Sequence, residues 1–205
     1  IEADAFMAAS KLPTTLFDMV IGGVISASFI PIFNDILTKK DREKATGFAN
    51  KFITMIILIT LIISAVGIIF ADPLVSFMAP NFEAQTHELA VSLTSIMFPM
   101  IIFTGLAFSF VGILQSFGEY NIPSIISLVS NIAIIAYFII FGKEFGVKGL
   151  AVTMVISWSL QVIVQVPSLV KLKFRYKPDF RLYDKDIQSA ILLAIPMLIS
   201  TWVQP

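Results

Sequence analysis

The chain has 205 residues, of which 57% are hydrophobic and only 14% are charged, and its net charge is zero. Its mean hydropathy of +0.90 lies outside the range of soluble domains, so the chain is predicted to be an integral membrane protein. Zero net charge without a basic block argues against a nucleic-acid partner, and the absence of cysteine excludes a disulfide framework, a thiolate metal site and a cysteine nucleophile within this chain.

The first predicted span, residues 4–33, is membrane-like in composition yet carries charges. On a helix, residues seven apart return to within about 20° of each other, so Asp4, Lys11 and Asp18 share one polar stripe. Thr15 falls on the same stripe. Ionisable groups inside a membrane are costly and usually face a bundle interior or a water-filled cavity. These four residues are therefore predicted to line a polar, substrate-binding cavity.

A simpler explanation exists for two of these charges. Asp4 could lie among the lipid headgroups, and Lys11 could extend along its own stem to the membrane surface, which would make both residues anchors. Asp18 fits this explanation less well, because about 14 residues of helix, roughly 21 Å, separate it from Asp4.

Pro13 and the pair Gly22 and Gly23 predict a bend in this first span. Proline removes the backbone hydrogen bond to residue 9, and the two glycines add a second soft point. We expect these three residues to act as a hinge, although proline kinks are common in membrane helices of every kind.

Five further apolar stretches follow, and four of them have charge-free runs long enough to cross ~30 Å of hydrocarbon. Continuous apolar runs exclude a membrane β-barrel, whose strands alternate. The predicted fold class is therefore all-α, a polytopic transmembrane bundle with about six spans. The later spans are Phe52–Ala71, Leu89–Gly118, Tyr120–Gly142, Gly149–Val170 and a sixth from Ile187.

The basic residues predict the orientation. Eleven of the fourteen lie in two connections, between the first and second spans and between the fifth and sixth. Alternation of the spans places both connections on one side, which the positive-inside rule assigns to the cytoplasm. In the second connection the bases interleave with Phe174, Tyr176 and Phe180. That pattern could bind anionic lipid headgroups, but a plain juxtamembrane anchor explains it as well.

The later spans carry only mild polar residues, for which interhelical hydrogen bonding is the default expectation and substrate contact the alternative. The chain has no paired acid–base site, metal-ligand cluster, glycine-rich phosphate loop or serine elbow, which argues against an enzyme and against a cofactor or metal. The polar residues are Ser109, Gln115, Ser130, Asn131, Ser157, Gln161 and Gln165.

Several short motifs occur in order along the chain. They are Ala3-Asp4-Ala5-Phe6, Lys11-Leu12-Pro13, Gly22-Gly23, Ser28-Phe29-Ile30-Pro31, Phe70-Ala71, Ala79-Pro80-Asn81-Phe82, Phe98-Pro99, Gly112-Ile113-Leu114-Gln115, Ile122-Pro123 and Gln165-Val166-Pro167-Ser168-Leu169. Each motif alone is weak. The ordered set, which covers essentially the whole chain, resembles the MurJ/MviN family of lipid II flippases, within the multidrug/oligosaccharidyl-lipid/polysaccharide exporter superfamily.

This resemblance implies a fold of fourteen helices in two lobes around a central cationic cavity. Residues 1–183 would supply the second to sixth helices, most of the N-terminal lobe, and residues 184–205 the start of the seventh. The chain begins with Ile1 and stops at Pro205 inside an apolar run, so we expect both ends to be truncated.

The resemblance also implies a multi-pass protein of the bacterial cytoplasmic membrane that uses no cofactor. Its substrate would be lipid II or a related polyprenyl-pyrophosphate-linked lipid, its other partners membrane lipids, with a coupling ion as an open alternative. The lobes would rock so that the pyrophosphate-sugar-peptide headgroup crosses through the cavity.

Asp4 and Lys11 match the family's motif, whereas Phe17 and Asp18 stand where many members carry basic residues. The arginines that favour pyrophosphate in the family lie on its first helix, outside this chain. Lys11 would supply one charge, and the flanking Asp4 and Asp18 would hold it in place and pair with it when the substrate leaves.

Two competing functions remain open at this point. A cation-coupled multidrug or polysaccharide exporter of the same superfamily would depend on an ion-coupling carboxylate, for which Asp4 or Asp18 is available. A non-transporting membrane scaffold for cell-wall enzymes would instead need the cytoplasmic basic loop and not the polar stripe.

Overall fold

The structure is a computed structural model that describes residues 2–22 and 24–203, including their side chains apart from those of 20, 21, 26, 27 and 197–203. All regular secondary structure within these residues is helical, which confirms the predicted all-α class. The elements are α1 (Glu2–Phe17), the π-helical segments η1 (Asp18–Gly22) and η2 (Ile25–Phe29), α2 (Ile30–Lys39), α3 (Arg42–Ile69), α4 (Ala71–Met78), α5 (Ala84–Met97), α6 (Met100–Ser116), α7 (Asn121–Ile140), α8 (Gly142–Lys171) and α9 (Lys185–Val203).

Four stretches of the described chain are long and apolar enough to cross a membrane: α3, α5 with α6, α7 and α8. They correspond to the second to fifth predicted spans. The first predicted span is not among them, because it carries charges and is divided between α1, the two π-helical segments and α2. The sixth span, which begins at α9, is not among the four either.

Local chemistry sets two of the helix boundaries. Asp41 precedes α3 and its side chain accepts a hydrogen bond of 2.7 Å from the backbone N–H of Lys44, which satisfies one free donor of the first turn. Gly118 takes a positive φ of 78° in the turn after α6. Glu119 Oε1 then accepts a hydrogen bond of 2.9 Å from the N–H of Asn121, the first residue of α7.

The chain reverses between α7 and α8 at Gly146, whose φ of 53° interrupts the first turns of α8. A side chain would be strained there, so glycine suits this position. The hydroxyl of Tyr137 donates a hydrogen bond of 2.5 Å to the carbonyl oxygen of Gly146 and ties the reversal to α7.

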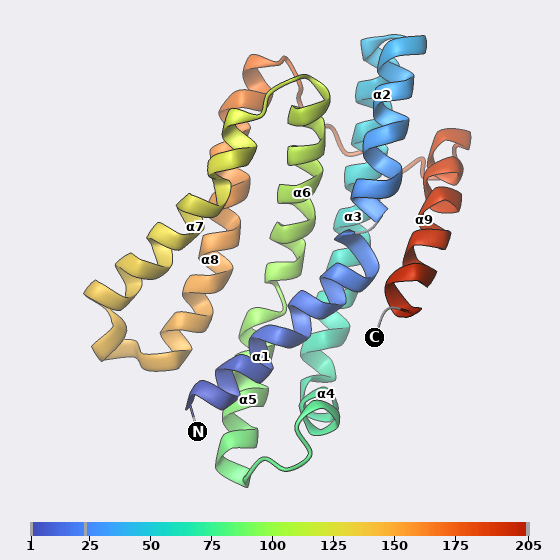
Figure 1. The fold of residues 1–205 in the computed structure, drawn as a ribbon. Coiled ribbons are helices and arrows are strands. Elements are labelled where there is room, and N and C mark those ends of the chain that lie inside the picture. Colours follow the sequence, from blue (N-terminus) through green and yellow to red (C-terminus); the bar gives the residue numbers. More distant parts are fainter. Residues whose placement is uncertain (1, 23, 204–205) are drawn as a thin grey trace.

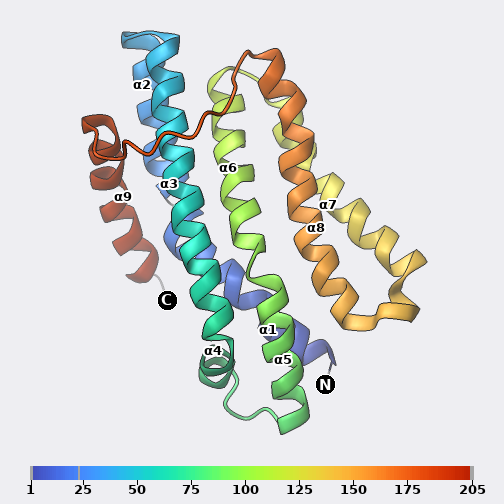
Figure 2. The ribbon, with the colours of Figure 1, turned by 180° about the vertical axis from the view of Figure 1, so that it is seen from behind.

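The connections sort to two ends of the bundle (Figure 1, Figure 2). The α2–α3 turn, the α6–α7 turn and the long α8–α9 segment (residues 172–184) lie at one end, and α4 and the α7–α8 reversal lie at the other. This confirms that the two basic connections share a side. Figure 2 also shows the α8–α9 segment crossing α3 on the face of the bundle opposite to α1.

Aromatic rings hold the opening segment against α3. The Phe29 ring is fully buried, and its centroid lies 4.6 Å from that of Phe52, 5.5 Å from Phe33 and 5.7 Å from Phe48. Between membrane helices such packing contacts stabilise the fold, because lipid gives little hydrophobic drive for helix association.

Small residues bring α1 close to α5. Ala5, Ala9 and Leu12 of α1 are buried together with Ala90 and Leu93 of α5 in one cluster. Alanines allow two helix backbones to approach closely in a membrane. This contact fixes the rotation of α1 and therefore decides which side chains it turns away from α5.

Candidate functional site

The charged face of α1, which we define as Asp4, Lys11, Thr15 and Asp18, lies opposite the contact with α5. All four residues are exposed in the described chain. The first three lie on α1 itself, whereas Asp18 is the first residue of η1. The structure therefore places the four predicted residues on the accessible side of the opening segment.

Asp18 borders a small hollow of about 220 Å³ between α1, α6 and α8. Thr104, Phe108 and Trp158 line the same hollow. The ring of Phe17, next to Asp18 in sequence, lies 5.4 Å from that of Phe108. The Asp18 carboxylate thus borders a hollow whose other lining residues include two rings and a threonine from α6 and α8.

Lys11 makes no ion pair within the described part of the chain. The expectation that Asp4 and Asp18 hold its ammonium group stays a prediction. Seven residues of helix separate Lys11 from each carboxylate, about 10 Å along the axis, so both side chains would have to stretch to meet.

The opening segment changes direction between α1 and α2 (Figure 1). Pro13 lies inside α1, which continues for four residues beyond it, and Gly22 is the last residue of η1. Gly23, the third residue of the predicted hinge, lies outside the described residues. The change of direction coincides with π-helical geometry, a departure from the α-helix that is frequent at functional sites.

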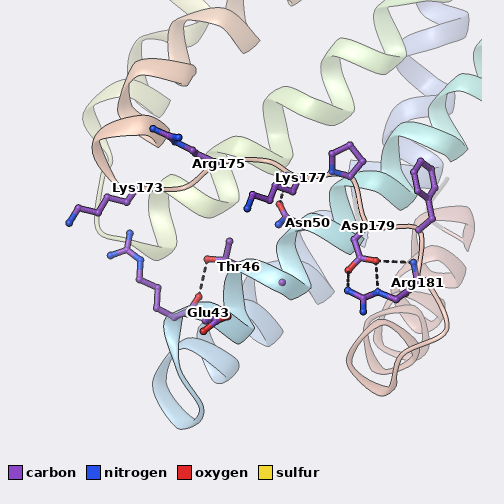
Figure 3. Close-up of a pocket in the computed structure, with 12 residues that line it drawn as sticks. Glu43, Thr46, Asn50, Lys173, Arg175, Lys177, Asp179 and Arg181 are labelled. Atoms are coloured by element: carbon purple, nitrogen blue, oxygen red, sulfur yellow. Dashed lines mark hydrogen bonds and ion pairs between the residues drawn. The ribbon is translucent and has the colours of Figure 1, made fainter.

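A second feature is a cleft of about 1130 Å³ at the end of the bundle that holds the basic connections (Figure 3). It opens between the first turns of α3 and the α8–α9 segment, and we call it the basic cleft. Its charged lining residues are Arg42, Glu43, Lys173, Arg175, Lys177, Asp179 and Arg181.

Three of these cations are exposed along the segment. Lys173, Arg175 and Lys177 are exposed, whereas Phe174 is 3% exposed and Tyr176 is partly buried. Lys173 lies in the turn that ends α8, with a positive φ of 54°, and the burial of the two rings beyond it leaves Arg175 and Lys177 turned outward. Figure 3 shows the three bases along the segment above α3.

Side chains of α3 hold this segment in place. Asn50 Oδ1 accepts a hydrogen bond of 3.1 Å from the N–H of Lys177, and Thr54 Oγ1 accepts one of 3.1 Å from the N–H of Asp179. The Thr54 hydroxyl also lies 2.9 Å from the Tyr176 hydroxyl. Each such bond contributes about 1 kcal/mol, so α3 anchors the backbone of the segment at Lys177 and Asp179.

Two carboxylates near the cleft are paired. Arg181 Nε and Nη2 donate hydrogen bonds of 3.0 and 2.9 Å to the two oxygens of Asp179, and these bonds lower the pKa of Asp179 from its ordinary 3.8 to about 2. The ammonium group of Lys51 donates a hydrogen bond to Asp184, which lowers the pKa of that carboxyl. The second pair joins α3 to the start of α9.

Two more cations bind partners of their own. The guanidinium of Arg42 donates to the carbonyl oxygen of Leu172 and lies 4.8 Å from the centre of the Phe117 ring. Lys40 Nζ lies 3.1 Å from Asp186 Oδ2.

Lys173, Arg175 and Lys177 form no ion pairs with the described residues. Three neighbouring cations can form charge-assisted hydrogen bonds to phosphate oxygens, and they can equally anchor the protein at a membrane surface. The alternation of bases with rings is visible in the sequence. The contacts with Asn50 and Thr54 are not, because more than 120 residues separate the partners.

The mild polar residues of the later spans behave in two ways. Gln165 is fully buried and its Nε2 donates to the carbonyl oxygens of Ala107 on α6, at 3.2 Å, and Gln161, at 3.0 Å, so the interhelical expectation is confirmed for this residue. For Ser109 and Ser157 it is wrong, because each hydroxyl donates to the carbonyl four residues earlier in its own helix.

No group of three or more histidine, aspartate or glutamate residues within the described part of the chain is arranged to hold a metal ion.

Comparisons with known proteins identify the family of the chain. The family model for lipid II flippase MurJ matches residues 1–204. A probable lipid II flippase MurJ from Buchnera aphidicola subsp. Schizaphis graminum is 34% identical over 179 residues, which cover 85% of this chain and 35% of that protein. One from Rickettsia prowazekii is 29% identical over 206 residues, which cover 98% of this chain and 40% of that protein.

The fold is also similar to a solved structure of lipid II flippase MurJ in an inward closed conformation. The TM-score is 0.77 at 22% sequence identity, and the match covers 97% of this chain and 42% of the other. The chain thus spans roughly a third to two-fifths of the length of the proteins that it resembles. Because the family model matches nearly every residue, the chain belongs to the lipid II flippase MurJ family.

Proposed function

We propose that the protein containing this chain is a lipid II flippase of the bacterial cytoplasmic membrane. It moves the pyrophosphate-sugar-peptide headgroup across the bilayer by alternating access, while the lipid tail stays among the acyl chains. The observation that carries this proposal is the match to the family model over residues 1–204. The activity is transport, in which no covalent bond of the substrate changes.

The charged face of α1 is the part of the headgroup path that this chain supplies. A pyrophosphate that leaves water must replace its hydration with charge-assisted hydrogen bonds, which an ammonium group gives in a water-filled recess. Lys11 contributes one such charge, and Asp4, Thr15 and Asp18 contribute polar groups along the same side. Support comes from the exposure of all four residues.

The hinge of this path is the stretch from Pro13 to Gly23. The lobes have to change their relative tilt during alternating access, and a helix with a proline, two glycines and π-helical turns bends at low cost. Support comes from the change of direction between α1 and α2 (Figure 1).

Complementation tests the proposal. The full-length protein is expected to restore growth and cell-wall synthesis in a strain depleted of its flippase, and Lys11→Ala and Asp4→Ala variants are expected to fail at normal membrane levels. Lys143→Ala, which removes an exposed cation at the α7–α8 reversal, serves as the matched control and is expected to complement. Normal complementation by both α1 variants would remove the site assignment.

Rescue by the wild-type protein also separates the candidate functions. A multidrug exporter would give drug resistance without restoring cell-wall synthesis. A scaffold would tolerate loss of Lys11 and would fail when the cations of the α8–α9 segment are removed. Membership of the MurJ family favours the flippase over both.

Thiol labelling tests whether the charged face lies in water. The chain contains no cysteine, so a single Lys11→Cys substitution in an otherwise cysteine-free protein reports on one position. A membrane-impermeant maleimide is expected to label that thiol in intact cells or spheroplasts. Ile132→Cys, on an exposed apolar side of α7, is the control and is expected to stay unlabelled. Equal protection of both thiols would place Lys11 in lipid.

A further inference from the structure

A groove of about 470 Å³ runs between α6, α7 and α8, apart from both the charged face of α1 and the basic cleft. α8 packs against both other helices, and α7 descends beside α8 from the α6–α7 turn (Figure 1). None of the described residues that line this groove is charged. We call it the neutral groove.

The lining of the neutral groove includes several uncharged hydrogen-bonding groups. Gln115 comes from α6, Ser127, Ser130 and Asn131 come from α7, and Gln161 comes from α8. Amide side chains both donate and accept hydrogen bonds, and hydroxyls do the same. Their convergence from three helices on one hollow is unusual for spans whose other exposed residues are mostly apolar.

Aromatic rings also line the groove. Phe108, Tyr120 and Trp158 line the same groove, and the rings of Phe108 and Trp158 lie 6.5 Å apart. Pockets for small organic groups typically combine such apolar and aromatic walls with a few polar groups that fix orientation. All three rings provide flat apolar surfaces, and the tyrosine hydroxyl and the tryptophan N–H add polar groups.

Gln161 supplies an amide that is open to the groove. The residue is only 5% exposed and lines the groove, and its side chain makes no hydrogen bond with any described residue. Its amide atoms are not among the fully buried atoms without a partner, which in the described part of the chain are Thr94 Oγ1 and Gln165 Oε1. The Gln161 amide therefore faces the space of the groove, where it can donate to and accept from a ligand.

The neutral groove adjoins the hollow that Asp18 borders. Phe108 and Trp158 line both this groove and the hollow that contains Asp18. A headgroup whose charged part lies beside α1 can therefore extend past these two rings toward α7 and α8. The distance along α7 from Tyr120 to Asn131 is about 16 Å, enough for one or two sugar rings.

The chemistry of the lining selects the kind of ligand. A phosphate would require cations, which the lining lacks, and an acyl chain would leave the amides and hydroxyls without partners. A sugar that carries amide substituents fits both the polar and the aromatic lining residues. Its hydroxyl and amide groups donate and accept hydrogen bonds, and its ring faces are apolar. We propose that the neutral groove is the subsite for the uncharged amino-sugar portion of the headgroup, an inference that rests on the proposed function.

A binding comparison with two lipids tests this subsite in the full-length protein. One lipid is a polyprenyl pyrophosphate that carries N-acetylated amino sugars, and the other is the same polyprenyl pyrophosphate without sugars. Asn131→Leu and Gln161→Leu keep the approximate size of the side chain and remove its hydrogen bonds. Each is expected to weaken binding of the sugar-bearing lipid about 3- to 10-fold and to leave binding of the sugar-free lipid unchanged.

Controls keep the outcomes distinct. Gln85→Leu, at an exposed position of α5, is expected to bind both lipids as the wild type does. Asn131 is exposed, so its variant remains informative if the variant at Gln161 fails to fold. Unchanged binding of the sugar-bearing lipid by the Asn131 variant, or equal loss of both lipids, would overturn the subsite. If the wild-type protein bound neither lipid, the proposed function itself would fail.

Discussion

Replacing Gly67 by alanine is expected to destabilise the bundle, although alanine is the better helix former. Gly67 lies in α3, is buried, and faces the ring of Phe98. A Cβ atom added at residue 67 would overlap three carbon atoms of that ring. Phe98 is fully buried at the break between α5 and α6, so its ring can move only by displacing other packed groups.

Two opposing energies decide the outcome. Exchanging glycine for alanine within a helix stabilises it by about 1 kcal/mol. Overfilling a packed interior costs about 1–3 kcal/mol, and the full burial of the ring favours the upper end of that range. We therefore expect Gly67→Ala to lower the free energy of unfolding by about 1–2 kcal/mol.

Gly47 offers a matched control in the same helix. A Cβ atom there would meet nothing within 4 Å, so Gly47→Ala is expected to stabilise by up to about 1 kcal/mol. Denaturant titration of the purified full-length variants in one detergent measures both effects. If the two substitutions shifted the unfolding midpoint in the same direction, the claim that residue 67 has no room for a Cβ atom beside the Phe98 ring would be refuted.

Three further results are expected. Phe29→Ala should cost about 3 kcal/mol of unfolding free energy because it empties the centre of the ring cluster, whereas Phe138→Ala, at a position 59% exposed, should cost little; equal losses in a denaturant titration would contradict this. Asp184→Asn should remove the ion pair with Lys51, costing about 1 kcal/mol, and speed proteolysis within residues 172–184; an unchanged cleavage rate would count against that anchor. The pKa of Asp179 lies below its ordinary 3.8, at about 2, so the stabilisation by its arginine partner is complete above pH 4 and lost as the pH falls through 2. Pepsin cleavage of the segment, measured relative to cleavage of an unfolded reference peptide at the same pH, should therefore increase toward pH 2 in the wild type, and Asp179→Asn should remove that relative increase.

Much of the fold follows from the sequence because it depends on local composition and period. Continuous apolar runs long enough to cross the hydrocarbon core of a bilayer predict helices. Four of the predicted spans are confirmed, by α3, α5 with α6, α7 and α8. The alternation of the spans predicted that the two basic connections share a side, which the arrangement in Figure 1 confirms. The 3.6-residue period placed Asp4, Lys11 and Thr15 on one exposed side of α1.

The tertiary structure alone decided the rotation and pairing of the helices. Many faces of these spans are apolar, so the sequence could not indicate which face would meet which neighbour. It could not show that Gln165 would find a carbonyl on α6 while Gln161 would line a groove without a partner. The hydrogen bond from the N–H of Lys177 to Asn50 joins residues 127 positions apart. Such contacts depend on packing across the bundle, which local sequence patterns do not predict.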